Sequence, residues 1–248
     1  MIEFVGVHKR FGEKVILDGV DLKADAGEIL FVIGTSGAGK SVLIQQVVGL
    51  LAPDRGQVLV DGQDVTRLSE AAFYPIRMKC ALVFQHATLF DSMTCAENVA
   101  LPLRKHFKLS RAQANERALE FLAQVQMESF ASTYPATLGD GLRKRVAVAR
   151  ALTLDPKYIL FDEPTTSLDP VSARRVDALI LDLSRKRGAT CIVVSHDLRS
   201  IFSIADRVAM LYKGQVRALG TPTEIRASLD PVVQQFITGS QEGPLETT

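Results

Sequence analysis

Residues 34–41 read GTSGAGKS and fit the phosphate-binding pattern G-x-x-x-x-G-K-[ST]. The apolar run at residues 29–33 precedes this loop and predicts a buried strand. From Val42 onward, apolar residues recur at helical spacing. The glycines therefore lie where a strand turns into a helix, which is the context that the pattern requires.

This geometry predicts a site for the phosphates of a nucleotide. Glycines let successive backbone N–H groups converge on a phosphate, and the helix N-terminus adds the positive end of its dipole. Lys40 is expected to reach the β- and γ-phosphates and the Ser41 hydroxyl to bind Mg²⁺. The alternative is a glycine-rich turn that binds nothing, and the complete pattern with both flanks favours the nucleotide. The predicted nucleotide-binding residues of this stretch are Gly34, Thr35, Ser36, Gly37, Ala38, Gly39, Lys40, Ser41 and Val42.

The composition is that of an ordinary globular protein. The chain has 248 residues, 47% of them hydrophobic and 23% charged, enough for one core or a core with an appended lobe. The net charge of +1 gives no bulk electrostatic reason to expect nucleic acid as a partner. Three widely separated cysteines argue against a disulfide framework or a zinc site. No apolar run approaches the roughly 20 residues that span a bilayer, so no membrane-spanning helix is expected. The N-terminal residues include an early acid and lack the apolar stretch of a signal peptide, so none is expected.

The first part of the chain predicts strands separated by glycine turns. Residues 2–8 predict a strand, and residues 9–27 predict turn, strand, turn, strand, with Gly19 as one of the breaks. Further strands are predicted at residues 57–60 and 80–84.

Strand patterns disappear between residues 86 and 156. Ser110 and Gln113 form a possible capping pair for one helix, and a second helix is predicted to begin near Gly141 or Leu142. This segment therefore predicts a helical lobe inserted into an α/β core. The polar tail that begins at residue 239 is expected to be loose.

A second buried strand ends in two adjacent acids. Residues 157–161 are mostly apolar, and Asp162 and Glu163 follow them. In this position Asp162 would hold Mg²⁺, and Glu163 would orient or deprotonate a water molecule. The alternative is an acidic surface turn, which is disfavoured beside a phosphate loop.

Two further polar side chains follow predicted core strands. Gln85 comes after residues 80–84, and His196 comes after the strand at residues 189–194. Ligands of open α/β sheets bind outside the carboxyl ends of the strands, so both side chains are expected at the same edge as the phosphate loop. Gln85 is predicted to reach Mg²⁺ or the attacking water, unless it only caps its strand. His196 is predicted to contact phosphate rather than to serve a purely structural role.

Two features leave their alternatives open. Phe11, in the first turn, would either stack on an adenine ring or fill a gap between strands. The basic run at residues 143–145 would either meet phosphate or a carboxylate, or form a solvated helix face.

The order of these features resembles the ATP-binding subunits of ABC transporters over essentially the whole chain. The corresponding parts are the aromatic turn at Phe11, the Walker A loop at 34–41, the Q-loop at Gln85, the signature region at 138–145, the Walker B strand at 158–163, the D-loop around Asp169 and the switch histidine at His196. The resemblance implies an α/β fold: a P-loop NTPase (RecA-like) core of mainly parallel sheet, an antiparallel β subdomain and an inserted helical lobe. It implies one nucleotide-binding domain over 1–248, with core at 1–85 and 155–238, lobe at 86–154 and polar tail at 239–248. ATP and Mg²⁺ are the implied ligands.

Several stretches of sequence resemble the Mla-type lipid-transport ATPases in particular. Among them are residues 84–103, FQHATLFDSMTCAENVALPL, and residues 221–239, TPTEIRASLDPVVQQFITG. That family implies phospholipid transport across the envelope of double-membraned bacteria, at the cytoplasmic face of the inner membrane. The implied partners are a second copy of the chain in a head-to-tail dimer, a multi-pass permease, an MCE-domain lipid-binding protein and a small STAS-domain protein.

The signature region departs from the family pattern. Where the family usually has LSGG, this chain has Leu138, Gly139, Asp140 and Gly141. The serine that would bind the γ-phosphate on the opposing subunit is thus a glycine, and the loss of such a donor typically lowers the rate about 10²- to 10³-fold. Gly141 is retained, so a helix N-terminus can still meet phosphate there.

These features are compatible with three alternative functions. The first is a transport-coupled ATPase, and the second is an ATP-binding dimerisation or regulatory module with little hydrolysis. The third, an ABC protein that acts on DNA or ribosomes, is disfavoured because this chain has neither a long insertion nor a second nucleotide domain.

Overall fold

The computed structural model of the chain describes residues 1–245. The fold is organised around a six-stranded sheet. The strand order is β10-β9-β3-β8-β7-β6, and all neighbours are parallel except β10, which pairs antiparallel with β9. The strands are β3 (Ile29–Ile33), β6 (Cys80–Val83), β7 (Tyr158–Asp162), β8 (Thr190–Val194), β9 (Arg207–Tyr212) and β10 (Gln215–Gly220). The predicted α/β class with a mainly parallel sheet is confirmed.

A smaller antiparallel sheet stands beside it, in the order β2-β1-β4-β5. Its strands are β1 (Ile2–Phe11), β2 (Lys14–Ala24), β4 (Arg55–Val60) and β5 (Gln63–Asp64). β4 begins two residues before the predicted strand. The chain thus contains the antiparallel β subdomain that the resemblance implies.

The prediction of two strands within residues 9–27 was wrong. β2 is one strand that passes through Gly19, because this glycine forms a bulge and no turn. Val7 pairs with Val20 and His8 with Asp18, so Gly19 is the extra residue, and its φ of 73° suits a glycine in a bulge.

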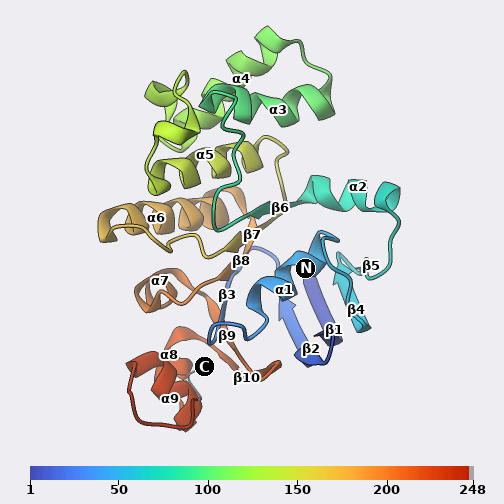
Figure 1. Cartoon of the computed structure of the whole chain (residues 1–248), viewed down its shortest axis with the longest axis vertical. Helices are drawn as coiled ribbons and strands as arrows, with labels where there is room; N and C mark the ends of the chain where they lie inside the picture. The colour runs from blue at the N-terminus through green and yellow to red at the C-terminus, as the bar shows by residue number, and fades with distance from the viewer. Residues whose placement is uncertain (246–248) are drawn as a thin grey trace.

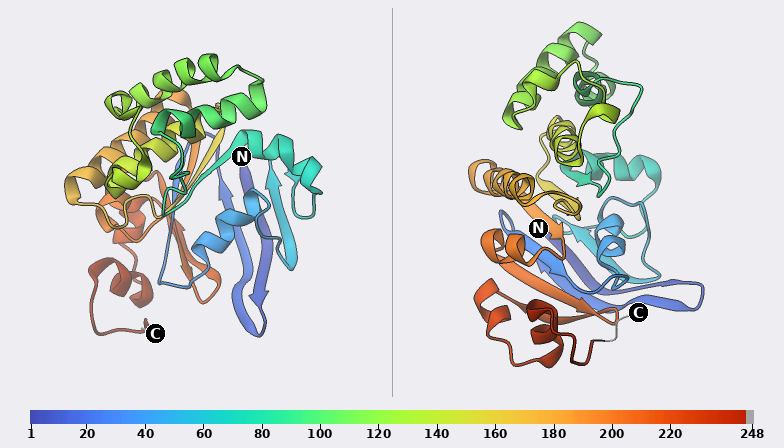
Figure 2. Two further views of the ribbon diagram at one scale, coloured as in Figure 1. Left: turned by 45° about the horizontal axis from the view of Figure 1, so that its top comes forward. Right: turned by 60° about the vertical axis from the view of Figure 1, so that its left-hand side comes forward.

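Helices cover both faces of the central sheet. The helix α1 (Lys40–Val47) lies on the same side as the antiparallel sheet, and α6 (Pro170–Arg187) and α7 (Leu198–Ile204) lie on the other (Figures 1 and 2). The remaining helices of the core are α2 (Glu70–Lys79), α8 (Pro222–Arg226) and α9 (Pro231–Thr238). No helix within residues 1–245 combines the length and the apolar character that a membrane span needs.

Strand β3 divides the interior into two hydrophobic cores. All five of its residues are buried, and successive side chains point to opposite faces. Leu30 and Val32 join the core beneath α1 and the antiparallel sheet, whereas Phe31 joins the core beneath α6. The phosphate loop therefore extends from a strand that is fixed from both sides.

Between β6 and β7 the regular structure is helical. It consists of α3 (Cys95–Phe107), α4 (Arg111–Gln124), α5 (Asp140–Leu152) and the 3₁₀ turns Glu128–Phe130 and Pro135–Thr137, and it forms the top of Figure 1. The capping pair at the start of α4 is confirmed, since Ser110 and Gln113 cap each other's backbone N–H groups. α5 begins at Asp140, one or two residues before the predicted start. Gly139 is its extended N-cap, and an acid in the first turn is favoured by the helix dipole.

The polar tail is more ordered than predicted as far as residue 245. The buried amide of Gln235 donates to the Ser240 carbonyl and accepts from the Leu245 N–H, so this stretch folds back on α9. The end of the predicted tail, residues 246–248, lies outside the described residues.

Candidate active site

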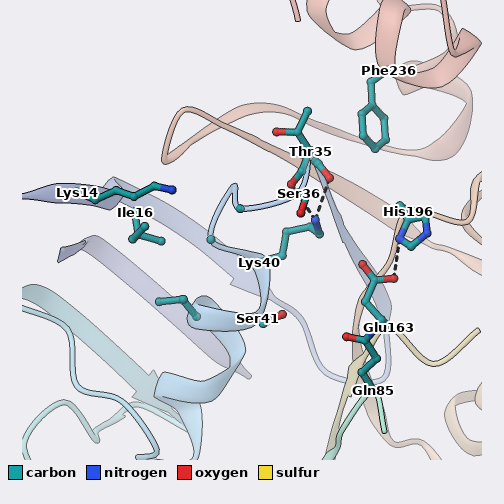
Figure 3. Close-up of a pocket in the computed structure, with 14 residues that line it drawn as sticks. Lys14, Ile16, Thr35, Ser36, Lys40, Ser41, Gln85, Glu163, His196 and Phe236 are labelled. Carbon is teal, nitrogen blue, oxygen red and sulfur yellow. Dashed lines mark hydrogen bonds and ion pairs between the residues drawn. The ribbon is translucent and has the colours of Figure 1, made fainter. Parts of the chain in front are cut away.

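A cavity of about 640 Å³ opens at the carboxyl edge of the central sheet (Figure 3). It is lined by Lys14, Ile16, Gly34, Thr35, Ser36, Gly37, Gly39, Lys40, Ser41, Val42, Gln85, Glu163, His196 and Phe236. The loop after β3 brings most of them, and Gln85, Glu163 and His196 follow β6, β7 and β8. The structure thus brings together residues that lie far apart in the sequence.

The phosphate loop has a backbone that only glycines permit at two positions. Gly34 and Gly39 have φ values of 146° and 98°. A Cβ on Gly34 would lie 2.2 Å from the Leu211 carbonyl oxygen, and one on Gly39 would lie 2.6 Å from Cδ2 of Leu17. Helix α1 begins directly after Gly39 without a side-chain cap, so the N–H groups of its first turn are available to an anion.

Lys40 is enclosed within the loop. Its ammonium donates to the carbonyl oxygens of Gly34 at 2.9 Å and Thr35 at 3.0 Å, and the residue is only 8% exposed. Burial lowers the pKa of Lys40, while the carboxylates of Glu163 and Asp162 act against that shift. A lysine held in this way presents its charge to the centre of the loop, where phosphate would lie.

Ser41 and Asp162 form a pair of oxygen ligands suited to Mg²⁺. The Ser41 hydroxyl donates to Oδ1 of Asp162 at 2.7 Å, and burial raises the pKa of this carboxyl group. A divalent cation beside the pair would favour the ionised carboxylate. Residues 1–245 contain no cluster of three or more His, Cys, Asp or Glu side chains arranged for a metal. Gln85, phosphate oxygens and water are the further oxygen ligands that a Mg²⁺ ion would find in this cavity.

Glu163 is fixed by contacts to both its side chain and its backbone. Oε2 accepts from the Thr166 hydroxyl at 3.0 Å and lies 2.9 Å from Nδ1 of His196 (Figure 3). Its φ of 50° lies in the left-handed region, which costs a non-glycine residue about 1–3 kcal/mol. Surrounding contacts must therefore hold this conformation, which directs the carboxylate into the cavity.

Lys144, on the helical lobe, supplies one of those contacts. Its ammonium donates to the carbonyl oxygens of Glu163 at 3.1 Å and Thr166 at 2.7 Å. Lys144 is 4% exposed, and burial lowers its pKa to about 8. A side chain at the start of α5 thus holds the backbone turn that carries Glu163.

Neither reading of the basic run at residues 143–145 was correct for the run as a whole. Lys144 and Arg145 are buried, and Arg145 donates to the Val125 carbonyl within the lobe. Only the half-exposed Arg143 meets a carboxylate, that of Asp140. Backbone carbonyls at the end of α4 and after β7 are the main partners, and the sequence gives no direct sign of them.

Four predicted site residues do not line the cavity. Ala38 lies buried within the loop, and Asp162 reaches the cavity only through Ser41. Phe11 lies at the end of β1, 48% exposed, with the Lys9 ammonium 5.4 Å from its ring centre. Gly141 lies at the start of α5 against Ser172. Stacking by Phe11 and phosphate binding by Gly141 remain predictions.

Sequence reasoning missed Lys14, Ile16 and Phe236 as lining residues and Lys144 as the support of Glu163. Lys14 and Ile16 lie in the first half of β2, before Gly19, and no local pattern marks them as site residues. Because α5 carries four cations, Arg143, Lys144, Arg145 and Arg150, no local signal marks Lys144 as the support of Glu163.

An enclosed lysine, glycine-rich N–H groups and a fixed carboxylate meet here at one edge of a parallel sheet. This arrangement suits the binding of a nucleoside triphosphate and the activation of water beside its last phosphate. Proteins that combine them in this way are P-loop nucleoside triphosphatases.

Sequence comparison identifies the family. Residues 17–166 match the ABC transporter family, and the chain belongs to it. It is an ATP-binding subunit of the ABC type, an ATPase whose ligands are ATP and Mg²⁺.

Relatives with different named substrates are similar to this chain. The probable ribonucleotide transport ATP-binding protein mkl of Mycobacterium bovis is 37% identical over 98% of this chain and 68% of its own. The methionine import ATP-binding protein MetN of Rhizobium johnstonii is 40% identical over 97% and 65%. The intermembrane phospholipid transport system ATP-binding protein MlaF of Haemophilus influenzae is 37% identical over 99% and 93%.

A solved ATP-binding cassette has the same architecture. It is a dimer in a post-hydrolysis state bound to ADP and Pi, with a TM-score of 0.82 and 33% identity over 90% of this chain and 99% of its own.

The contact of Lys144 predicts a loss of turnover when it is removed. In Lys144→Met the Glu163 turn loses its donor, and we expect kcat for ATP hydrolysis to fall about tenfold or more while ATP affinity changes less than about threefold. Steady-state phosphate release and calorimetric titration with ATP measure the two quantities.

Arg145→Met is the matched control, because it removes a buried cation from the same helix without touching Glu163. Its folded fraction should keep its kcat. Equal losses of kcat in both variants would show that Lys144 acts only through the stability of the lobe.

Proposed function

We propose that this chain powers phospholipid transport across a bacterial envelope together with a membrane permease. The observation that carries this proposal is the similarity to MlaF, which extends over 93% of that protein. The MetN and mkl relatives are matched over smaller shares of their own lengths.

In the proposed mechanism, the phosphate loop and Lys40 bind the β- and γ-phosphates of ATP. Ser41, Asp162 and Gln85 would hold Mg²⁺, and the ion would neutralise charge at the transferred phosphoryl group. Glu163 orients the attacking water and receives its proton. His196 is 60% exposed and its Nδ1 lies 2.9 Å from Oε2 of Glu163; in this mechanism its imidazole would also contact the γ-phosphate.

A second copy of the chain completes each site in this proposal. The start of α5 does not line the nucleotide cavity of its own chain, so its Gly141 would serve the partner in a head-to-tail dimer. ATP at both sites would hold the dimer closed, and hydrolysis would release it. The motion would reach the permease at the inner membrane, with MCE-domain and STAS-domain proteins as further partners and no role for nucleic acid.

Replacing the Glu163 carboxylate tests the assigned chemistry. We expect Glu163→Gln to bind MgATP with an affinity within about threefold of the native chain and to lose at least about 10²-fold in turnover, because the amide cannot accept a proton. Calorimetry and phosphate release measure these effects. Turnover that survives the substitution would exclude Glu163 as the base.

The altered signature favours a second candidate, an ATP-gated dimerisation module with slow hydrolysis. Gly139 has no hydroxyl donor for the γ-phosphate of the partner's ATP, and the Asp140 carboxylate would repel that phosphate, although Arg143 pairs with Asp140 and partly neutralises its charge. For the variant with Gly139→Ser and Asp140→Gly, we expect phosphate release to rise at least about tenfold.

The same two changes in the Glu163→Gln background provide the control, since no rate should be restored there. If the native chain already releases phosphate as fast as the variant with Gly139→Ser and Asp140→Gly, the dimerisation module with slow hydrolysis is excluded.

Partner identity tests the phospholipid proposal. The tagged Glu163→Gln chain, expressed in its native cell with MgATP present throughout isolation, is expected to retain a multi-pass permease, an MCE-domain protein and co-purifying phospholipid, as identified by mass spectrometry. The untagged chain is the control. Recovery of a permease with a methionine- or nucleotide-binding protein in place of the MCE-domain protein would overturn the proposal.

A further inference from the structure

Phe236 brings an aromatic ring from the end of the chain into the nucleotide cavity. It belongs to α9 and lines the cavity together with Thr35 and His196, and Figure 3 shows it on the other side of the phosphate loop from Lys14 and Ile16. Among the described residues that line this cavity it is the only phenylalanine, tyrosine or tryptophan. The rest of the wall consists mainly of glycines and polar side chains, with Ile16 and Val42 as further apolar members, and Phe236 itself also packs against the core beneath α6.

The position of the ring indicates which part of a nucleotide it would face. Glu163, Gln85 and His196 mark the end of the cavity where the last phosphate of a triphosphate would lie. Lys14 and Ile16 lie at the opposite end, where β2 passes the loop. Phe236 is on the side of His196, so it belongs to the terminal-phosphate end.

The ring is part of a fixed wall because α9 is anchored on several sides. Val232 and Val233 are buried in the core shared with α6. Asp230 caps the helix and pairs with Arg217 of β10 at 2.7 Å. The buried Gln235, adjacent to the ring, holds the following residues back against the helix.

We propose that Phe236 contacts the terminal-phosphate region of a bound nucleoside triphosphate. This inference rests on the proposed ATP site. An apolar ring at this place excludes water from one side of the phosphate and strengthens the neighbouring electrostatic contacts. It also joins the site to a segment outside the matched family region of residues 17–166.

A single tryptophan can report on this contact because the natural chain contains none. In Phe236→Trp, we expect the fluorescence emission to change saturably with Mg²⁺ and a non-hydrolysable ATP analogue. The midpoint should agree with the dissociation constant that calorimetry gives for the same variant. The response to MgADP should be at most about half as large, because ADP lacks the phosphate nearest the ring.

Phe202→Trp is the matched control. Phe202 is also partly buried and lies near α9, but it lines a different cavity beside Arg226. The emission of this control variant should stay constant. Equal responses of the two variants, or equal responses of Phe236→Trp to the triphosphate and to MgADP, would overturn the proposed contact.

Removing the ring tests its contribution to the reaction. We expect Phe236→Ala to raise the KM for ATP about three- to tenfold, while Ile237→Ala, which alters the next residue on the other side of α9, leaves it unchanged. If calorimetry shows ATP binding but the emission of Phe236→Trp does not respond and KM is unaffected, the role of Phe236 is disproved and the ATP site stands. If the native chain shows no ATP binding, the proposed function and this inference both fail.

Discussion

The parallel arrangement of β3, β6, β7 and β8 is the constraint on which the site depends. Parallel strands end at a common edge, so the residue that follows each strand is delivered to the same place. Because β3 is central and buried on both faces, the phosphate loop has little freedom to shift relative to Glu163 and His196. The strand order thus determines which side chains meet at the site.

Features that depend on neighbours in the sequence were predictable. The phosphate loop and the acidic pair after β7 are local patterns. Gln85 could be assigned to the same edge because it follows a core strand, and the carboxyl ends of parallel strands meet at one edge of the sheet. Features that depend on packing between distant elements were not. Gly19 is compatible with a turn or a bulge until its pairing with β1 is known, and nothing near Phe236 in the sequence indicates a place beside the phosphate loop.

The helical lobe is tied to the reaction centre by a polar contact within one chain. Lys144 reaches from α5 to the backbone of Glu163, and the altered signature residues lie at the start of the same helix. A change at Gly139 or Asp140 can therefore affect the site of its own chain as well as that of a partner. A displacement of the lobe would likewise shift the backbone of Glu163 and with it the carboxylate that acts on water.

The hydrophobic core beneath α6 has a consequence for how the chain unfolds. That core is one continuous cluster which includes Phe31 of the central strand, Leu103 and Leu122 of the helical lobe, and Val232 of α9. Heating cannot release the lobe or the C-terminal helix without exposing apolar surface that the central sheet shares. Independent melting of the lobe would therefore cost the free energy of exposing that shared surface, which favours unfolding of the lobe and the sheet together.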